Sequence, residues 1–262
     1  MTKPRILLID IETVPLESWT WGTWDQNVGL EQIKTEWSII SYAAKWVGSK
    51  SITYRDTGGK GVAKVRDDKA LLGEIRELLD KADIVVAQNG KKFDIKKINA
   101  RLIEQGYGPY SPVRVIDTLE VAKKYFAFTS NKLKWLSSHL TDAPKDDHKK
   151  FPGFELWSEC LLDNPAAWRE MKKYNKQDIV SLEKVYLKMR PWIANHPNLA
   201  AYSESLERKC PKCDSPHVIK KGIAMTTAGK YQQFQCKDCG GWSRGKQMLN
   251  DLAKRKSLLV AQ

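Results

Sequence analysis

The sequence has no long apolar segment. Among its 262 residues there is no run of about 18 apolar residues, the length that spans a bilayer as a helix. Its first residues, MTKPRILLIDIET, do not have the succession of charged, apolar and small residues that marks a secretory signal. These absences exclude a membrane-spanning class, and we expect a cytoplasmic protein with no membrane partner.

Cysteine is scarce and unevenly distributed. Four of the five cysteines lie between Cys210 and Cys239, a clustering that suits a metal site better than a secreted disulfide scaffold. The glycine-rich stretch TGGKG, residues 57–61, lacks the Ser or Thr and the spacing of a phosphate-binding loop, so we interpret it as a turn.

Acidic residues are outnumbered by basic ones. The chain contains 44 Lys and Arg against 31 Asp and Glu, for a net charge of +13, and 42% of its residues are hydrophobic. That hydrophobic content is enough for a substantial core. The positive charge favours a polyanionic partner, and nucleic acid is the leading candidate.

The composition changes near residue 195. Asn195, Pro197 and Asn198 are typical of the break after a long helix, and they suggest two domains, 1–195 and 196–262. Residues 200–262 contain 12 Lys and Arg and 5 Asp and Glu, against 32 and 26 in residues 1–199. The short C-terminal part is therefore the more basic of the two.

Strand and helix patterns alternate in the first domain and predict an α/β fold built on a mixed sheet. Helical spacing predicts helices over residues 68–82 and 94–106, and residues 119–193 are expected to be helical, with Pro144, Pro152 and Pro165 as breaks or helix starts. Five segments have strand character: residues 5–10, 38–48, 51–56, 82–89 and 113–117.

Acidic residues occur at three positions along these elements. Asp10 and Glu12 are two apart on a strand, so both side chains point to the same face. Asp94 follows a strand and opens a helix, where it is either a site residue or an ordinary N-cap. Tyr174 and Asp178 are neighbours on one helix face, either as a site or as a solvated pair.

Taken together, these residues predict a metal site. Two like charges at the end of an apolar strand raise each other's pKa and destabilise the fold unless a cation neutralises them. Carboxylates can hold two divalent ions that lie about 3.5 to 4 Å from each other. Such a pair of ions can generate hydroxide from water and stabilise a leaving oxygen. The chemistry that this arrangement suits is phosphodiester hydrolysis.

The motifs LLIDIET, Asn89 to Asp94, and Tyr174 to Asp178 resemble, in that order, the three exonuclease motifs of the DEDD superfamily, which has an RNase-H-like fold. The third motif is similar to that of the tyrosine-containing DEDDy branch, because no histidine occurs in YNKQD. Within that branch the chain most resembles the YprB-like group and the proofreading domains of family B DNA polymerases. The resemblance covers roughly residues 4–192.

The resemblance implies a mixed five-stranded sheet flanked by helices and removal of nucleotides from a free 3′ end. It implies that Asp10, Glu12, Asp94 and Asp178 hold two Mg²⁺ or Mn²⁺ ions, which prefer oxygen ligands. It implies that Tyr174 orients the attacking water, and that Asn89 either supports the site or contacts the terminal nucleotide.

The spacing of the clustered cysteines predicts a structural zinc site. CPKC and CKDC pair Cys210 with Cys213 and Cys236 with Cys239, and four thiolates close a tetrahedral site with no open position. Two disulfides are the alternative, which a cytoplasmic location disfavours. The stretch also resembles the zinc ribbons of some transposases.

Basic and aromatic residues are interleaved in this predicted ribbon, a pattern that favours contacts with nucleic-acid backbone and bases over the alternatives of a protein dock or a solvated face. The candidate contacts here are Lys220, Lys221, Trp242, Arg244 and Lys246.

Tryptophan is abundant, with ten residues. Trp19, Trp21 and Trp24 follow the first acidic motif, where they either stack on bases or pack over the sheet, and Trp21 is the candidate base contact. Six others lie in apolar patterns and are expected to be buried or half-buried: Trp37, Trp46, Trp135, Trp157, Trp168 and Trp192.

These features predict a metal-dependent 3′–5′ exonuclease that prefers DNA and uses two catalytic Mg²⁺ or Mn²⁺ ions and one structural Zn²⁺. A ribonuclease that trims RNA 3′ ends is the rival within the same class. The rival from another class is a catalytically silent nucleic-acid-binding module of a replication or recombination complex, whose proteins would be its partners.

Overall fold

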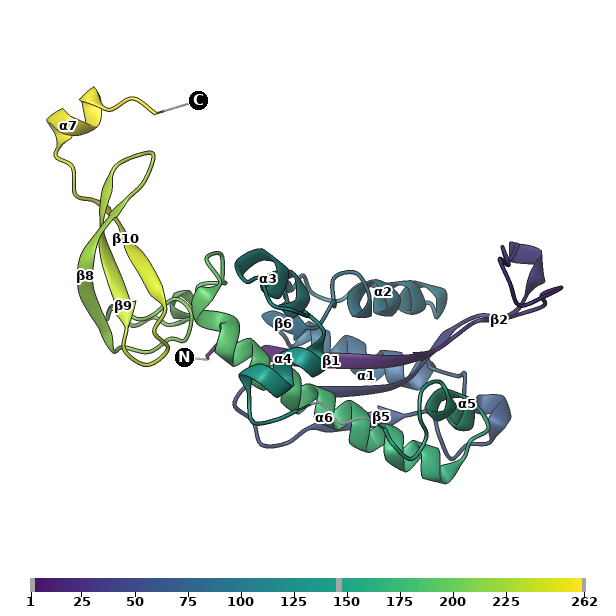
Figure 1. Ribbon diagram of the computed structural model, residues 1–262. Coiled ribbons are helices and arrows are strands. Elements are labelled where there is room, and N and C mark those ends of the chain that lie inside the picture. The colour runs from purple at the N-terminus through teal and green to yellow at the C-terminus, as the bar shows by residue number, and fades with distance from the viewer. Residues whose placement is uncertain (1–2, 145–147, 261–262) are drawn as a thin grey trace. The chain divides into compact units, whose positions relative to one another are not determined.

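The computed structural model describes residues 3–144 and 148–260 (Figure 1). The chain divides into two compact units, one formed by Arg5–Tyr186 and one whose main part begins at Leu187. The first unit holds the predicted sheet and the second holds the cysteine cluster. None of the helices in the described part of the chain combines the length and apolarity needed to cross a membrane.

The main sheet has five strands in the order β5-β4-β1-β6-β7. The pairs β1–β4 and β4–β5 are antiparallel, whereas β1–β6 and β6–β7 are parallel. This mixed sheet confirms the fold class predicted from the sequence. Its strands are β1 (Ile6–Val14), β4 (Ser38–Trp46), β5 (Thr53–Asp56), β6 (Ile84–Ala87) and β7 (Arg114–Asp117).

Helices cover both faces of this sheet (Figure 1). Side chains of α1 and α2 form one apolar cluster with Leu7, Ile9 and Ile11 of β1, and side chains of α5 and α6 form a second cluster with Val14. Alternate residues of β1 therefore face opposite helical layers. The helices that begin in the first unit are α1 (Lys69–Asp80), α2 (Asp94–Glu104), α3 (Thr118–Tyr125), α4 (Leu133–Leu140), α5 (Glu155–Leu161) and α6 (Pro165–Met189), and the last three residues of α6 belong to the second unit.

The long helical stretch predicted over residues 119–193 is interrupted. Residues 126–132 and 141–144 are not helical, and neither are residues 148–154, which include Pro152. Pro165 begins α6, as expected for a residue whose missing N–H costs nothing in the first turn. Pro144 and Pro152 therefore mark breaks, whereas Pro165 marks a helix start.

A small hairpin follows β1. It consists of β2 (Glu17–Ser18) and β3 (Ile33–Thr35), which pair antiparallel. Arg66 fastens its base, since its Nη2 donates to Glu17 Oε1 at 2.7 Å and its Nη1 donates to backbone carbonyls. Trp19, Trp21 and Trp24 are exposed, Trp21 to 99%, so the alternative that they pack over the sheet is wrong.

A buried ion pair joins three elements of the first unit. Arg101 of α2 donates to both carboxylate oxygens of Asp68, at 2.7 and 2.8 Å, and the backbone N–H of Ile39 on β4 donates to the same carboxylate. Asp68 is the N-cap residue of α1. The pair therefore holds both helices against β4, which borders the β1 strand that carries the acidic motif.

The second unit contains a three-stranded antiparallel sheet in the order β10-β9-β8. Short 3₁₀ turns at Arg190–Trp192 and Leu199–Tyr202 precede it. The remaining elements are β8 (Val218–Met225), β9 (Lys230–Cys236), β10 (Trp242–Met248) and α7 (Leu252–Ser257).

Candidate functional site

The first two acidic residues lie on the central strand β1. Asp10 and Glu12 alternate with Ile9 and Ile11, and these isoleucines are buried against the α1 and α2 layer. The carboxylates therefore project to the opposite face, where α6 lies. The pairing with β4 shifts register between Glu12 and Thr13, where β4 carries one extra residue, Ile40.

Helix α6 supplies the third acid. One carboxylate oxygen from each of Asp10, Glu12 and Asp178 lies within 4.8 Å of the other two. Asp178 is buried, and the other two are partly buried. Three carboxylates this close repel one another when ionised, and oxygen donors in this arrangement suit a hard divalent ion such as Mg²⁺ or Mn²⁺.

The side chain of Asp94 contacts the backbone of β1. It is the first residue of α2, whose N-cap is Phe93, so the alternative that Asp94 is an ordinary N-cap is wrong. Its Oδ1 instead accepts a hydrogen bond from the N–H of Ile11, at 3.1 Å. Ile11 lies between Asp10 and Glu12, although Asp94 is not among the three acids whose oxygens lie within 4.8 Å.

Burial changes the acidity of Asp94. Its side chain is 3% exposed, and burial raises its pKa to about 7 against the lowering effect of the Ile11 N–H, with Asp117 raising it further. In the metal-free protein Asp94 therefore holds a proton up to near-neutral pH. A cation placed beside it would favour the ionised form.

Asn175, which the sequence patterns did not single out, positions Asp10. It is fully buried on α6, and its Nδ2 donates to Asp10 Oδ2 at 2.5 Å. Its Oδ1 accepts from the Ser41 hydroxyl of β4 at 3.3 Å. An amide held on both sides fixes the orientation of the Asp10 carboxylate, as outer partners of metal ligands do.

Tyr174 lies one turn before Asp178 on α6. Its ring meets His148 and Trp157 edge-on, with centroids 5.0 and 6.2 Å away, and these contacts restrict the ring orientation. His148 Nδ1 is hydrogen-bonded to the carbonyl of Phe151 at 2.6 Å. The aromatic neighbours therefore come from the segment between α4 and α5 and from α5 itself, which the sequence did not associate with the site.

Asn89 lies in the turn that leads into α2. It has a positive φ of 60°, a conformation that Asn tolerates better than most residues. Its backbone N–H donates to Asp117 Oδ1 at 2.9 Å, and that of Lys91 donates to Oδ2 at 3.1 Å. Asp117 also caps α3. The backbone of Asn89 therefore supports the segment that carries Asp94.

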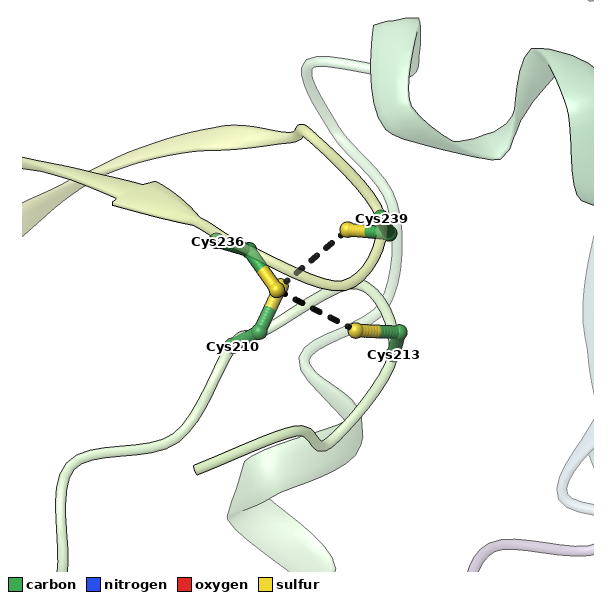
Figure 2. Close-up of side chains that lie close together, drawn as sticks. All are labelled: Cys210, Cys213, Cys236 and Cys239. Atoms are coloured by element: carbon green, nitrogen blue, oxygen red, sulfur yellow. Dashed lines mark hydrogen bonds between the residues drawn. The ribbon is translucent and has the colours of Figure 1, made fainter. Parts of the chain in front are cut away.

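The four clustered cysteines converge in the second unit (Figure 2). The Sγ atoms of Cys210 and Cys239 are 3.7 Å apart, and those of Cys213 and Cys236 are 3.6 Å apart. All four are free thiols, so the disulfide alternative is wrong. Zn–S bonds of about 2.3 Å in a tetrahedron place sulfurs about 3.8 Å apart, which these distances match.

The acidity of these thiols also bears on metal binding. Burial raises the pKa of Cys210 to about 11. Burial acts in the same direction on Cys236, but the backbone N–H groups of Cys239 and Asp238 outweigh it and lower the pKa of Cys236 to about 7. Because a metal takes thiolates, its binding displaces protons from this group.

The predicted nucleic-acid contacts of the second unit are exposed. Lys220 and Lys221 lie on β8, and Trp242, Arg244 and Lys246 lie on β10. Lys221 Nζ lies 5.3 Å from the centre of the Trp242 ring, and the Arg244 guanidinium lies 4.1 Å from the centre of the Tyr231 ring. Trp192, expected to be buried, is 63% exposed because it ends a short 3₁₀ turn at the surface.

A family model of the RNase H superfamily matches residues 39–190, more than half of the chain. The chain belongs to the RNase H superfamily. The matched part of this RNase H domain includes Asp94, Tyr174 and Asp178, whereas β1, with Asp10 and Glu12, precedes it.

The chain is also similar in fold to part of a solved DNA polymerase of family B, from the hyperthermophilic archaeon Pyrobaculum calidifontis. The TM-score is 0.50 and the sequence identity is 13%. The similarity covers 73% of this chain and 25% of the polymerase chain, so this chain spans about a quarter of the polymerase's length. No curated protein matches the sequence.

Membership of the RNase H superfamily supports nuclease activity in general, with nucleic acid as the substrate. The cluster of Asp10, Glu12 and Asp178 provides oxygen donors for the divalent ions that such nucleases use.

Proposed function

We propose that this chain is a metal-dependent 3′–5′ exonuclease that hydrolyses phosphodiester bonds at the 3′ end of nucleic acid and prefers DNA. The observation that carries the proposal is the convergence of Asp10, Glu12 and Asp178, which each place one carboxylate oxygen within 4.8 Å of the other two. Two of these acids lie on β1 and the third on α6, so only the folded chain joins them.

The acids would hold a pair of Mg²⁺ or Mn²⁺ ions. Asp10, Glu12 and Asp178 face one another directly, and Asp94 adds a buried carboxylate beside Ile11. When bound, such ions activate water and stabilise the leaving oxygen of a phosphodiester. The hydrogen bond from Asn175 would hold the Asp10 carboxylate in a fixed orientation while the ions are bound.

Tyr174 would orient the attacking water. An unperturbed tyrosine has a pKa of about 10, so its hydroxyl is a better hydrogen-bonding partner for water than a general base at neutral pH. His148 and Trp157 restrict the orientation of the ring that carries this hydroxyl.

Three observations support the 3′ end and DNA as substrate. The acidic and tyrosine motifs occur in the order of those in DEDDy exonucleases. The chain is similar in fold to a quarter of a family B DNA polymerase chain. The net charge of +13 favours a polyanion.

The C-terminal unit would be a zinc ribbon that raises affinity for nucleic acid. Four thiols at tetrahedral spacing favour one structural Zn²⁺. We propose as nucleic-acid contacts of the whole chain Asn89, Trp21, Lys220, Lys221, Trp242, Arg244 and Lys246.

The test is digestion of matched DNA and RNA oligonucleotides labelled at the 5′ end, with and without Mg²⁺ or Mn²⁺. The expected product is a metal-dependent ladder that shortens from the 3′ end, faster on DNA, and that a blocked 3′ end prevents. Asp178→Asn should abolish the ladder, whereas Asp142→Asn, at an exposed acid, should leave it intact.

Three results would contradict parts of the proposal. Wild-type digestion by Asp178→Asn would refute the site. Faster digestion of RNA would favour a ribonuclease that trims RNA ends. Salt-sensitive binding without products would favour a silent module of a replication or recombination complex.

A further inference from the structure

The C-terminal unit contains a surface cleft beside the cysteine cluster. Its volume is about 540 Å³, and its lining includes Arg190, Pro191 and Trp192 from one chain segment and Cys239 and Trp242 from another. All of these residues belong to the unit that begins at Leu187. None of the acids of the proposed exonuclease site lines this cleft.

Two tryptophans line the cleft and remain open to solvent. Trp192, in the 3₁₀ turn, is 63% exposed, and Trp242, the first residue of β10, is 41% exposed. Large aromatic rings are costly to leave in water, and two of them along one cleft offer flat apolar surfaces for another flat group.

The two segments that line the cleft are in contact with each other. The ammonium group of Lys212, which is buried, donates a hydrogen bond to the carbonyl of Pro191, next to Trp192. A Cβ on Gly241, next to Trp242, would meet Lys212 Cδ at 3.1 Å and Cys239 Sγ at 3.2 Å. The tryptophans are therefore carried by backbone segments that pack closely around Lys212 and the cysteine cluster.

The charges around the cleft favour an anion. Lys188 and Arg190 line it, and Lys221 Nζ lies 5.3 Å from the centre of the Trp242 ring while donating to Gln235 Oε1 at 2.8 Å. Asp238 is the acid in the lining, and His217 Nδ1 lies 3.0 Å from its Oδ1. A ligand that suits this cleft combines a flat apolar ring with negative charge.

We propose that the cleft binds an unpaired base of single-stranded nucleic acid by stacking on Trp192 and Trp242, with the flanking phosphates beside Lys188, Arg190 and Lys221. Every base has a π-face, so this binding tolerates any sequence. The site rests on the proposed nucleic-acid binding by the C-terminal unit and deepens it by adding Trp192 and a ligand class, and it needs none of the catalytic acids. It also gives Trp192, a residue expected to be buried, a role at the surface.

The test measures binding of a fluorescently labelled oligothymidylate to the full chain carrying Asp178→Asn, so that hydrolysis does not interfere. Trp192→Ala and Trp242→Ala should each weaken binding by about fivefold or more, as expected for the loss of one stacked base. Trp192→Phe and Trp242→Phe retain a ring and should stay close to the parent. Leu206→Ala, at an exposed apolar residue outside the cleft, is the matched control and should not change the affinity.

The basic residues beside the cleft are tested separately, through the salt dependence of oligonucleotide binding. Lys188→Gln and Lys221→Gln should each lower the slope of log affinity against log salt by about 0.7, the value for one phosphate contact on a single strand. Equal zinc content and melting temperature across the variants establish that the unit is folded. Parent-like affinity in both alanine variants, or equal losses for Phe and Ala at each position, would overturn the proposal. Failure of the exonuclease assay would leave this result unaffected.

Discussion

The buried position of Asp94 predicts a pH-dependent affinity for divalent metal. Burial raises the pKa of this carboxyl to about 7, and a divalent ion at the proposed site would bind its ionised form. Below pH 7 the ion therefore competes with a proton. If Asp94 is a ligand, the fraction ionised, and with it the apparent affinity, should fall about tenfold between pH 8 and pH 6.

The ionisation of Asp94 also affects the stability of the fold, but in the opposite direction: stability falls as pH rises, whereas metal affinity rises. The pKa of Asp94 is higher in the folded state than the usual value of 3.8, so the folded chain retains this proton longer than the unfolded one. Its contribution to stability is full below about pH 4 and is lost as pH rises through about 7, on the order of 4 kcal/mol in all. Metal should restore the loss at high pH, because it binds the ionised carboxyl of the folded state.

Calorimetric titration with Mn²⁺ from about pH 6 to about pH 8 measures the first effect, and urea denaturation with and without Mn²⁺ measures the second. Asp94→Asn should bind metal more weakly and lose most of this pH dependence. Asp142→Asn, the exposed control, should keep the wild-type profile. A wild-type affinity that is flat over this range, or an Asp94→Asn profile equal to wild type, would refute the reasoning.

Four further predictions concern neighbouring features. Tyr174→Phe keeps the ring contacts but removes the hydroxyl. Single-turnover rates on labelled DNA should therefore fall, while the affinity for the oligonucleotide stays the same. Unchanged rates would exclude a role for the hydroxyl. Asn175→Ala should weaken Mn²⁺ binding by about 10- to 100-fold in calorimetry, because Asp10 loses its orienting amide, and wild-type affinity would contradict this. Asp68→Ala should cost about 3 kcal/mol in urea denaturation, since it removes the buried partner of Arg101 and leaves only the half-exposed Glu104, and a cost below 1 kcal/mol would be inconsistent with that burial. Chelation of zinc should abolish oligonucleotide binding by the C-terminal unit, and unchanged affinity would indicate that the ribbon is not the binding element.

Much of the fold was predictable because its signals are local. The five strands of the main sheet follow apolar segments of the sequence, and α1 and α2 follow a helical period. The β2–β3 hairpin gave no such signal, because strands of two and three residues are too short to show alternation. The helical stretch predicted over residues 119–193 was expected to break only at its prolines, whereas residues 126–132, which contain no proline, are also not helical.

The site was predictable where its residues are close in sequence. Asp10 and Glu12 share a face through the two-residue period of a strand, and Tyr174 and Asp178 through the helical period. Asn175 lacked any such signal, because its partner Asp10 is 165 positions away and an asparagine within a polar helical segment is unremarkable. Only its burial, which depends on packing of α6 against β1, distinguishes it.

The exposure of Trp192 was also not predictable from the sequence, but here the error was to expect burial. Its apolar neighbours Pro191 and Ile193 suggested burial, yet Ile193 is buried while Trp192 points to solvent. A 3₁₀ turn changes the direction of successive side chains, and a short pattern does not reveal which of them faces inward.

The central claim is that acids distant in sequence share one pocket that holds a pair of divalent ions. Anomalous diffraction from crystals of the protein soaked in Mn²⁺ tests it most directly. We expect two manganese peaks about 3.5 to 4 Å apart, bound by carboxylates of Asp10, Glu12, Asp94 and Asp178. Crystals that show manganese elsewhere but none within coordinating distance of these carboxylates would contradict the claim.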